Sequence, residues 1–398
     1  MSREPGVAAT GGPITDAAVR SRSAVVRELR GGYVVEDVLV GPAGPGEVLV
    51  RVQACGLCHT DAIARSGLGG AGFFPAVLGH EGAGVVVAVG PGVEHLAPGT
   101  TVVLSFDSCG RCAPCRAGRP SYCVEFLERN IGGRGIDDRV AIRDAGGAPL
   151  TSRWFGQSSF GEFAIATARN CVPVEDDLPP EILAPLGCGF LTGAGTVLVE
   201  LDLRAGETLA VFGVGAVGLS AILAAKARGA AEIVAVDVQP ARLAVAERLG
   251  ATRVVDGTAP DLVQAVRAGT SGLDATFDTT GRASVMAAAV ESLGMGGRSA
   301  LCAATDELTV RPQALVGRSL TYVREGSADP HTLIPELVRM WRAGAFPVES
   351  LVRTYGLDEL DEAERDAASG AVVKPVILLP AAARPPGGPR IAVGPVLS

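Results

Sequence analysis

The chain has 398 residues, of which 47% are hydrophobic and 20% charged, and its formal net charge at pH 7 is −8. This composition is typical of a globular protein with two domains. The negative charge and the lack of long lysine or arginine runs argue against nucleic acid and acidic membranes as partners. Residues 1–14 lack the continuous apolar core of a secretory signal. Nine cysteines without such a signal indicate a reducing compartment, so we expect a cytoplasmic location.

The first part of the chain is rich in short β-type runs. Residues 1–22 are expected to form a flexible N-terminal extension. From Ala24 to Val52, runs of β-branched residues separated by Gly/Pro turns predict antiparallel strands. Two stretches with potential metal ligands follow at residues 54–61 and 79–90, and the second is a turn that leads into a strand.

Four cysteines then lie within fifteen residues with the spacing C-x2-C-x2-C-x7-C, at Cys109, Cys112, Cys115 and Cys123. Zinc prefers four thiolate or imidazole ligands in a tetrahedron, and a tight loop with four cysteines can surround it. Two disulfides or free buried thiols are the alternative. A site with four thiolates has no open position for a reacting group, so we predict a structural zinc site here and expect the chemistry elsewhere.

The pattern changes after residue 189 to strands that alternate with helices. Strands are predicted at 208–212, 232–236, 253–255, 274–277 and 298–302, and helices at 191–203, 216–228, 240–249, 262–268 and 283–293. This alternation indicates a parallel sheet covered on both faces. The uncharged run 208–225 also suits a membrane helix, but its glycines divide it into a strand and a helix.

The predicted architecture is therefore α/β, with a doubly wound parallel sheet of the Rossmann type inserted in a discontinuous β-rich catalytic domain. The inserted domain spans residues 190–330, and the outer domain comprises residues 23–189 and 331–380. A strand at 371–379 returns the chain to the outer domain. The Pro/Gly-rich residues 381–398 are expected to form a flexible tail.

The cofactor is indicated by Gly213-Val-Gly215-Ala-Val-Gly218, which follows an apolar strand and opens a helix. These glycines permit a tight turn, close approach to a pyrophosphate and close packing of helix on strand. Asp237, at the end of the next strand, is placed to accept both ribose hydroxyls and to repel a 2′-phosphate, which favours NAD over NADP. Arg242 either flanks the adenosine ribose or is a solvated helix residue.

Three candidate metal ligands remain: Cys58, His80 and Cys188. Ligands from distant parts of a chain are typical of catalytic sites, because three anchor points leave the fourth position open. Cys188 lies at the junction with the nucleotide domain, so a metal there would lie beside the nicotinamide. Zinc at this place acts as a Lewis acid that lowers the pKa of a bound alcohol and polarises an aldehyde.

These motifs together resemble the zinc-dependent medium-chain alcohol dehydrogenases over nearly the whole chain. The resemblance rests on Gly79-His80-Glu81 with the glycines that follow, on the four-cysteine spacing and on the Cys2His ligand set. Residues 155–164, 169–170 and 185–195 resemble the aryl (benzyl-type) members most. The resemblance implies a GroES-like outer domain, two Zn²⁺ per chain, NAD, a primary aromatic or allylic alcohol with its aldehyde as substrates, and a homodimer or homotetramer.

The resemblance also implies roles for individual residues around the ligands. Asp61 is implied to accept a hydrogen bond from the far nitrogen of His80, which fixes its tautomer, and Glu81 is implied to support the ligands. Thr60 is implied to receive the alcohol proton. His59 stands where many relatives place an arginine against the pyrophosphate, and a mostly neutral histidine grips it less strongly.

The sequence departs from many relatives after Asp61, where Ala62-Ile63-Ala64 contains no titratable group to pass the proton to solvent. We therefore hypothesise that the proton leaves through Thr60 with the cofactor ribose and His59 or water. Lys374 either contacts a cofactor phosphate or is a structural lysine. Trp154, Phe155 and Phe160 either line an apolar alcohol pocket or belong to the core.

Two other functions are compatible with this pattern. One is an aldehyde dismutase or thiol-adduct dehydrogenase of the same fold with tightly bound NAD. The other is a relative that binds nucleotide without catalysis. The complete set of Cys58, His80 and Cys188 argues against the second, because a site that has lost its chemistry usually loses a ligand first.

Overall fold

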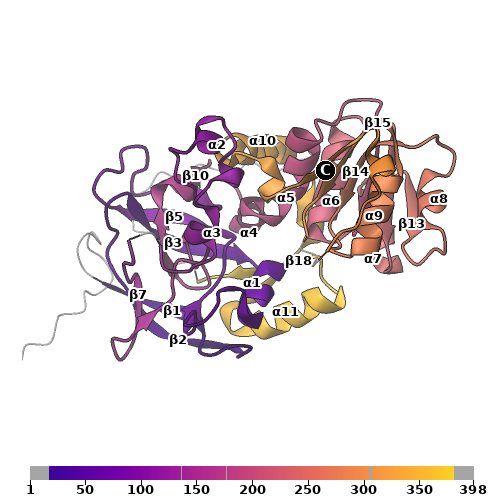
Figure 1. The fold of residues 1–398 in the computed structure, drawn as a ribbon. Coiled ribbons are helices and arrows are strands. Elements are labelled where there is room, and N and C mark those ends of the chain that lie inside the picture. Colours follow the sequence, from indigo (N-terminus) through magenta and orange to yellow (C-terminus); the bar gives the residue numbers. More distant parts are fainter. Residues whose placement is uncertain (1–17, 136, 176, 304–306, 381–398) are drawn as a thin grey trace, which may run out of the picture.

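The computed structural model describes residues 18–135, 137–175, 177–303 and 307–380. Figure 1 shows two lobes side by side, one from the N-terminal and C-terminal parts of the chain and one from its middle. The predicted extension ends too late, because β1 already begins at Val19. The predicted tail, 381–398, and residues 1–17 lie outside the described residues.

The first lobe contains two β-sheets. In the described residues the smaller sheet has the order β4-β1-β2-β7-β8, with β1 (Val19–Val26), β2 (Tyr33–Val40), β4 (Ala76–Val77), β7 (Ile142–Asp144) and β8 (Pro149–Leu150). All its strand pairs are antiparallel, as predicted for residues 24–52, whereas β4, β7 and β8 lie outside that predicted range. Seven of the sixteen residues of β1 and β2 are valine, whose β-branched side chain packs well on a pleated surface.

The larger sheet is built around β3 (Glu47–Gly56), whose side chains are mostly buried. Its order is β10-β6-β5-β3-β18-β17, with β9 pairing β3. The other strands are β5 (Gly82–Val89), β6 (Thr101–Leu104), β9 (Phe163–Thr167), β10 (Cys171–Pro173), β17 (Val352–Gly356) and β18 (Lys374–Leu378). β18 pairs with the end of β3 at Ala54–Gly56, so the C-terminal strand reaches the segment that leads to Cys58.

Helices and single helical turns connect the strands of this lobe. They are α1 (His59–Ile63), η1 (Ala64–Leu68), α2 (Ala113–Arg116), η2 (Pro120–Tyr122), α3 (Phe126–Asn130), η3 (Trp154–Gly156), η4 (Ala168–Asn170), α4 (Pro180–Leu183), η5 (Ala184–Gly187), η9 (Val348–Leu351), η10 (Leu357–Glu359) and α11 (Leu360–Ser369).

The second lobe contains a sheet whose described strands are all parallel, in the order β13-β12-β11-β14-β15-β16. Numbered from the first strand of this lobe, that is 3-2-1-4-5-6, the Rossmann order. The strands are β11 (Thr208–Phe212), β12 (Glu232–Asp237), β13 (Arg253–Asp256), β14 (Leu273–Asp278), β15 (Leu293–Leu301) and β16 (Ser319–Tyr322). The predicted fold class is confirmed.

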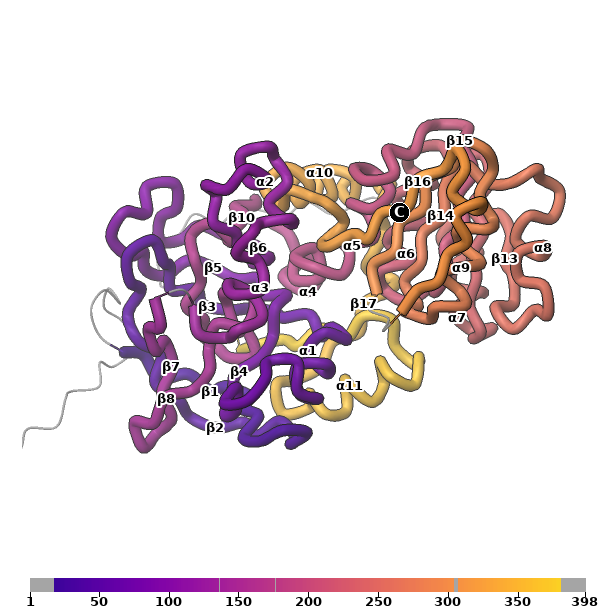
Figure 2. Tube along the Cα trace, in the orientation of Figure 1, coloured from indigo at the N-terminus to yellow at the C-terminus, as the bar shows by residue number. Residues whose placement is uncertain are grey.

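The helices of this lobe are α6 (Ala216–Ala227), α7 (Pro240–Leu249), α8 (Leu262–Arg267), α9 (Ala283–Glu291), η7 (Pro312–Leu315) and η8 (Glu325–Ser327). Helices α6 to α9 begin at the predicted residues. Two further helices lie between the lobes: α5 (Gly189–Gly195), which continues as the π-type turn η6 (Thr196–Glu200), and α10 (Pro330–Arg342) (Figure 2). Asp329 caps α10, its Oδ1 accepting from the His331 amide at 3.0 Å.

Among the described helices, none is by itself long and apolar enough to cross a membrane. The bent pair Pro180–Gly187 and Gly189–Glu200 reaches the required length and composition when taken together. The uncharged run 208–225 divides into β11 and α6, as its glycines predicted.

Candidate metal and cofactor site

The four-cysteine loop brings its thiols together without forming a disulfide. All nine cysteines are free, and the Sγ atoms of Cys109 and Cys115 lie 3.9 Å apart and those of Cys112 and Cys123 4.0 Å. Four sulfurs held at 2.3 Å from a central zinc would lie about 3.8 Å from one another. The loop therefore fits a tetrahedral zinc ion.

The backbone of this loop also favours thiolates. The amides of Arg111 and Cys112 donate to Cys109 Sγ at 3.4 and 3.3 Å, and the Cys109 amide donates to Cys123 Sγ at 3.2 Å. Backbone N–H groups of Val124 and Cys115 lower the pKa of Cys112 to about 6, whereas burial and the neighbouring Cys112 raise the pKa of Cys115 to about 12. Donors that stabilise the charged form of sulfur prepare the loop for a cation.

The second cluster contains the three dispersed ligands. The ligand atoms of Cys58, His80, Glu81 and Cys188 all lie within 4.8 Å of one another. Cys58 precedes α1, His80 and Glu81 precede β5, and Cys188 precedes α5, so the sheet and the interlobe helix together position the set. The structure thus brings together three residues that are up to 130 positions apart in sequence.

His80 is oriented by Asp61, which has no solvent exposure. Asp61 Oδ1 lies 2.9 Å from His80 Nδ1 and accepts from Trp154 Nε1 at 3.0 Å, while Oδ2 accepts from the Cys58 amide at 3.2 Å. The expected contact with the far nitrogen of His80 is therefore present. The opposite nitrogen, Nε2, is buried with no hydrogen-bond partner among the described residues. A buried, unpartnered imidazole nitrogen beside two thiols fits a metal ligand.

The protonation of this cluster also suits a cation. Contact with Cys188 lowers the pKa of Cys58 well below its ordinary value, and His80 acts in the same sense. Burial opposes protonation of His80, but Asp61 and Cys58 outweigh it and raise the His80 pKa well above its usual range. The lowered pKa of Cys58 and the raised pKa of His80 together indicate a thiolate beside a cationic imidazole, and a metal ion would replace the imidazole proton when it binds.

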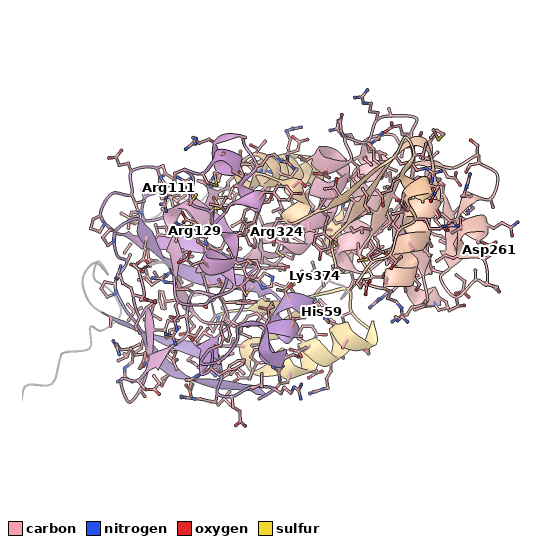
Figure 3. The ribbon with its side chains drawn as sticks, in the orientation of Figure 1. His59, Arg111, Arg129, Asp261, Arg324 and Lys374 are labelled. Carbon is pink, nitrogen blue, oxygen red and sulfur yellow. The ribbon has the colours of Figure 1, made fainter. Side chains whose placement is uncertain are left out.

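Glu81 forms an ion pair with Lys374, although both side chains are almost completely buried. Lys374 Nζ lies 2.7 Å from Glu81 Oε1 and 2.5 Å from Oε2, and it also donates to the Leu57 carbonyl at 3.2 Å. Burial disfavours the charge on Lys374, but Glu81 and Cys58 raise its pKa above the ordinary value. Figure 3 shows Lys374 and His59 in the region between the lobes. The structure thus places the ammonium group at the metal cluster.

Aromatic rings line one side of the cluster. The Phe155 ring stacks on His80 with centroids 4.5 Å apart, and Phe126 lies 6.3 Å from Phe155 and 5.6 Å from Phe106. Of the three predicted pocket aromatics, only Phe155 touches a ligand ring this way. The Trp154 indole N–H donates a hydrogen bond to Asp61, and Phe160 packs against Tyr33 in the core. Phe106 and Phe126 were missed, since no sequence signal separates them from core residues.

The glycine turn lies between β11 and α6, as predicted. Gly213 has a φ of +84°, and a Cβ on Gly218 would lie 2.0 Å from the Gly213 carbonyl oxygen. A Cβ on Gly215 would meet nothing within 4 Å, so open space lies in front of the N-terminus of α6. This space is the place for a pyrophosphate. The turn therefore fits a dinucleotide.

Asp237 closes the neighbouring strand beside this turn. Its Oδ2 accepts from the Val214 amide at 2.9 Å, and its Oδ1 accepts from the Gln239 amide at 2.9 Å. Arg242 approaches it to 3.9 Å. The carboxylate is thus fixed next to the Gly213–Gly218 turn, at the position where a ribose is expected.

The two remaining predicted residues lie at the start of α1. His59 is exposed, and Thr60 Oγ1 lies 3.7 Å from Cys58 Sγ. The side chain of Ile63 is exposed, and no described ionisable group occupies positions 62–64. A cavity of about 720 Å³ lies elsewhere, between η6, α10 and the cysteine loop, and none of the metal ligands lines it.

Comparison with known proteins agrees with this geometry. The model of the alcohol dehydrogenase GroES-like domain matches residues 44–176, and that of the zinc-binding dehydrogenases matches residues 216–340. The chain is 41% identical to geraniol dehydrogenase from Castellaniella defragrans, over 90% of this chain and 98% of that protein. It is 34% identical to S-(hydroxymethyl)glutathione dehydrogenase from Komagataella pastoris, over 91% and 98%. The crystal structure of benzyl alcohol dehydrogenase from Acinetobacter calcoaceticus superposes with a TM-score of 0.86 at 37% identity, covering 91% of this chain and 99% of that one.

The chain therefore belongs to the zinc-binding medium-chain alcohol dehydrogenases. As a member of this family it is an oxidoreductase that uses zinc and NAD. The resemblance predicted from the motifs is confirmed.

Proposed function

We propose that this enzyme interconverts a primary aromatic or allylic alcohol and its aldehyde, with Cys58, His80 and Cys188 holding the catalytic zinc and the four-cysteine loop the structural zinc. The observation that carries the proposal is the convergence of the three ligands, with His80 Nε2 unpartnered, beside a dinucleotide turn. Similarity to a geraniol dehydrogenase and a benzyl alcohol dehydrogenase supports the substrate class. The rings at Phe106, Phe126 and Phe155 offer an apolar surface for such a substrate.

The bound zinc supplies Lewis acidity toward the substrate oxygen. Around it, Asp61 keeps the Nδ1 proton of His80 and so leaves Nε2 free as a donor to the metal. In oxidation Thr60 Oγ1 would accept the hydroxyl proton of the alcohol, and the Gly213–Gly218 turn would hold NAD⁺ as the hydride acceptor, so that the alcohol becomes the aldehyde. Asp237 orients the cofactor through its ribose, with Arg242 beside it, and the Gly213–Gly218 turn receives the pyrophosphate.

For the proton we propose a route from Thr60 through the cofactor ribose to His59 or water. The exposure of His59 at the start of α1 and the absence of an ionisable group at residues 62–64 support this route. Replacement of His59 by Ala should change the pH–rate profile of alcohol oxidation. An unchanged profile would exclude His59 from the route.

A panel of benzylic, allylic and short aliphatic alcohols, followed by NADH absorbance, tests the proposed activity. We expect the highest kcat/KM with benzylic or allylic alcohols. The similarity to S-(hydroxymethyl)glutathione dehydrogenase keeps a thiol-adduct substrate as a second candidate, and S-hydroxymethylglutathione belongs in the panel. A dismutase would instead retain NAD through gel filtration.

We further propose a homodimer or homotetramer in the cytoplasm. β16 pairs only with β15 among the described strands, and Met295, Val316 and Tyr322 near this edge are 75%, 61% and 53% exposed. Unpaired strand edges with apolar side chains are suited to pairing with a second copy. Light scattering should give a mass of two or four chains, and Tyr322→Lys should lower it. Nine free cysteines support a reducing compartment.

A further inference from the structure

We propose that Arg324 binds an anionic group, most simply a carboxylate, at the end of the substrate remote from its hydroxyl. The enzyme would then prefer aryl alcohols that carry such a group over neutral ones. This inference rests on the proposed function, because it concerns the same site.

The first step is the row of aromatic rings that leads away from the ligand set Cys58, His80 and Cys188. Phe155 stacks on His80 at an interplanar angle of 27°, and Phe126 meets Phe155 edge-on at 87°. The guanidinium carbon of Arg324 lies 4.3 Å from the centroid of the Phe126 ring. The row therefore begins at a metal ligand and ends at a positive charge, so a substrate lying along it meets both.

The second step concerns the partners of Arg324. Several other partly buried arginines are paired with carboxylates, Arg65 with Glu364 at 2.7 Å, Arg129 with Asp107 at 2.9 Å and Arg298 with Glu207 at 2.6 Å, and Arg318 donates to the carbonyls of Gly294 and Ala314. Among the described residues, Arg324 has neither an ion pair with a carboxylate nor a side-chain hydrogen bond; its guanidinium lies over the Phe126 ring, and its charge also acts on Tyr322. Its charge is thus available to a ligand.

The third step is the orientation that stacking imposes. A guanidinium that lies over a ring face uses its π-surface for that contact and keeps its N–H donors in its own plane, at the edges. Those donors match the two oxygens of a carboxylate. Phe126 therefore holds the group without consuming the donors that would bind an anion.

The fourth step is the backbone that fixes Arg324. The next three residues, Glu325, Gly326 and Ser327, have φ values of +50°, +63° and +58°. A Cβ on Gly326 would lie 2.7 Å from the Thr192 carbonyl oxygen, so this segment packs tightly on α5, the helix that begins after Cys188.

Side chains of this left-handed segment hold it on both sides. Ser327 Oγ donates to Glu200 Oε2 at 2.6 Å and lies 2.7 Å from Tyr122 Oη in the cysteine loop. The Glu325 carboxylate faces Thr192 Oγ1 at 3.4 Å, which directs it toward α5. Arg324 is therefore attached to a rigid support that also carries a metal ligand, as a specificity-determining residue requires.

The experiment compares 4-(hydroxymethyl)benzoate with benzyl alcohol in the wild type, Arg324→Met and Arg324→Lys. We expect a lower KM for the carboxylated alcohol in the wild type and a loss of roughly 10- to 100-fold in its kcat/KM in Arg324→Met, mainly through KM. Benzyl alcohol should change by less than about threefold, and Arg324→Lys should recover part of the loss. In the wild type, the KM of the carboxylated alcohol should rise with salt.

Arg353→Met is the matched control, because Arg353 in β17 also stacks on a ring, that of Tyr355 at 5.2 Å, and its ion pair is with Asp366, so it does not contact the residues that hold Ser327. It should leave the ratio of the two substrates unchanged. Calorimetry should show that 4-formylbenzoate binds the complex of Arg324→Met with NADH more weakly than the complex of the wild type with NADH. Benzaldehyde should bind both complexes equally well.

Three outcomes overturn the proposal while leaving the proposed function intact. They are a wild type that prefers benzyl alcohol, an equal loss for both substrates in Arg324→Met, and equal binding of the carboxylated aldehyde by both proteins. An equal loss would mean that Arg324 only joins η8 to α3. A wild type inactive on every alcohol of the panel would instead overturn the proposed function itself.

Discussion

Asp61 Oδ1 lies 2.9 Å from Nδ1 of His80, and the same carboxylate binds the amide of Cys58, so one buried residue orients two of the three predicted ligands. Trp154 completes the arrangement by donating to the same oxygen. The geometry of the metal cluster therefore depends on a residue that does not belong to it.

Replacing Asp61 by Asn should weaken zinc binding at the catalytic site by roughly 10- to 100-fold. An amide lacks the negative charge that favours the required tautomer of His80, and its NH2 group would oppose the Cys58 N–H. Metal content after dialysis against a graded chelator measures this change. Asp358→Asn, in an exposed ion pair with Arg22, is the control and should retain zinc as the wild type does. Equal retention by both variants would contradict the prediction.

The two metal sites should separate in cysteine variants. Cys188→Ser should contain one zinc per chain, keep its thermal stability within a few degrees and lose activity by roughly 1,000-fold or more. Elemental analysis, calorimetric melting and NADH absorbance give the three readouts.

Cys112→Ser should also contain one zinc but should lower the free energy of unfolding by roughly 3–5 kcal/mol, because its loop has little core of its own. Cys171→Ala, a buried cysteine outside both clusters, should retain two zincs. Loss of both metals in either serine variant would argue against two independent sites.

Asp237→Asn should relax the preference for NAD. The amide keeps an acceptor for the Val214 amide but no longer repels a 2′-phosphate. We expect the ratio of kcat/KM for NAD over NADP to fall by roughly 10- to 100-fold. Asp256→Asn, at the paired position of β13, is the control and should not alter this ratio. An unchanged ratio in Asp237→Asn would place the discrimination elsewhere.

Stability should depend on pH through Asp278, at the end of β14. Burial raises the pKa of Asp278 to about 6, partly offset by hydrogen bonds from Thr280. Because the folded state holds this proton more tightly than the unfolded chain, protonation of Asp278 stabilises the folded state. This contribution to the free energy of unfolding is complete below about pH 4 and is lost as the pH rises through about 6.

Between pH 5 and pH 7 the wild type should thus lose about 1 kcal/mol relative to Asp278→Asn, as measured by urea unfolding at both pH values. Asp274→Asn, at the other end of the same strand and exposed, should follow the wild type. A constant difference between wild type and Asp278→Asn would show that Asp278 titrates alike in both states.

Local patterns were sufficient to predict much of the fold. The glycine turn, the strands β11 to β13 and the starts of α6 to α9 follow from hydrophobic periodicity and turn residues, which act within a few positions. β16 was not predicted, because a four-residue edge strand with half-exposed side chains carries little periodic signal. The predicted helix 191–203 ends earlier, as α5 gives way to a π-type turn at Thr196.

The site was predicted as far as residue chemistry allows. Metal ligands have distinctive side chains, so Cys58, His80 and Cys188 stand out even when they are distant in sequence. Phe126 and Arg324 have common side chains, and only the folded chain brings them within 4.3 Å. The same holds for the burial of Lys374 against Glu81, which no spacing rule indicates.

The cation of that last ion pair arrives late in synthesis. Glu81 leaves the ribosome nearly three hundred residues before Lys374, which lies in β18, the last strand of the described residues, between β3 and β17. Until this strand inserts, the Glu81 carboxylate lacks its counter-ion. A product truncated before β18 would consequently lack both the strand and the charge. A chain with an incomplete reaction centre would therefore also have an incomplete sheet, and cellular quality control would recognise the incomplete sheet.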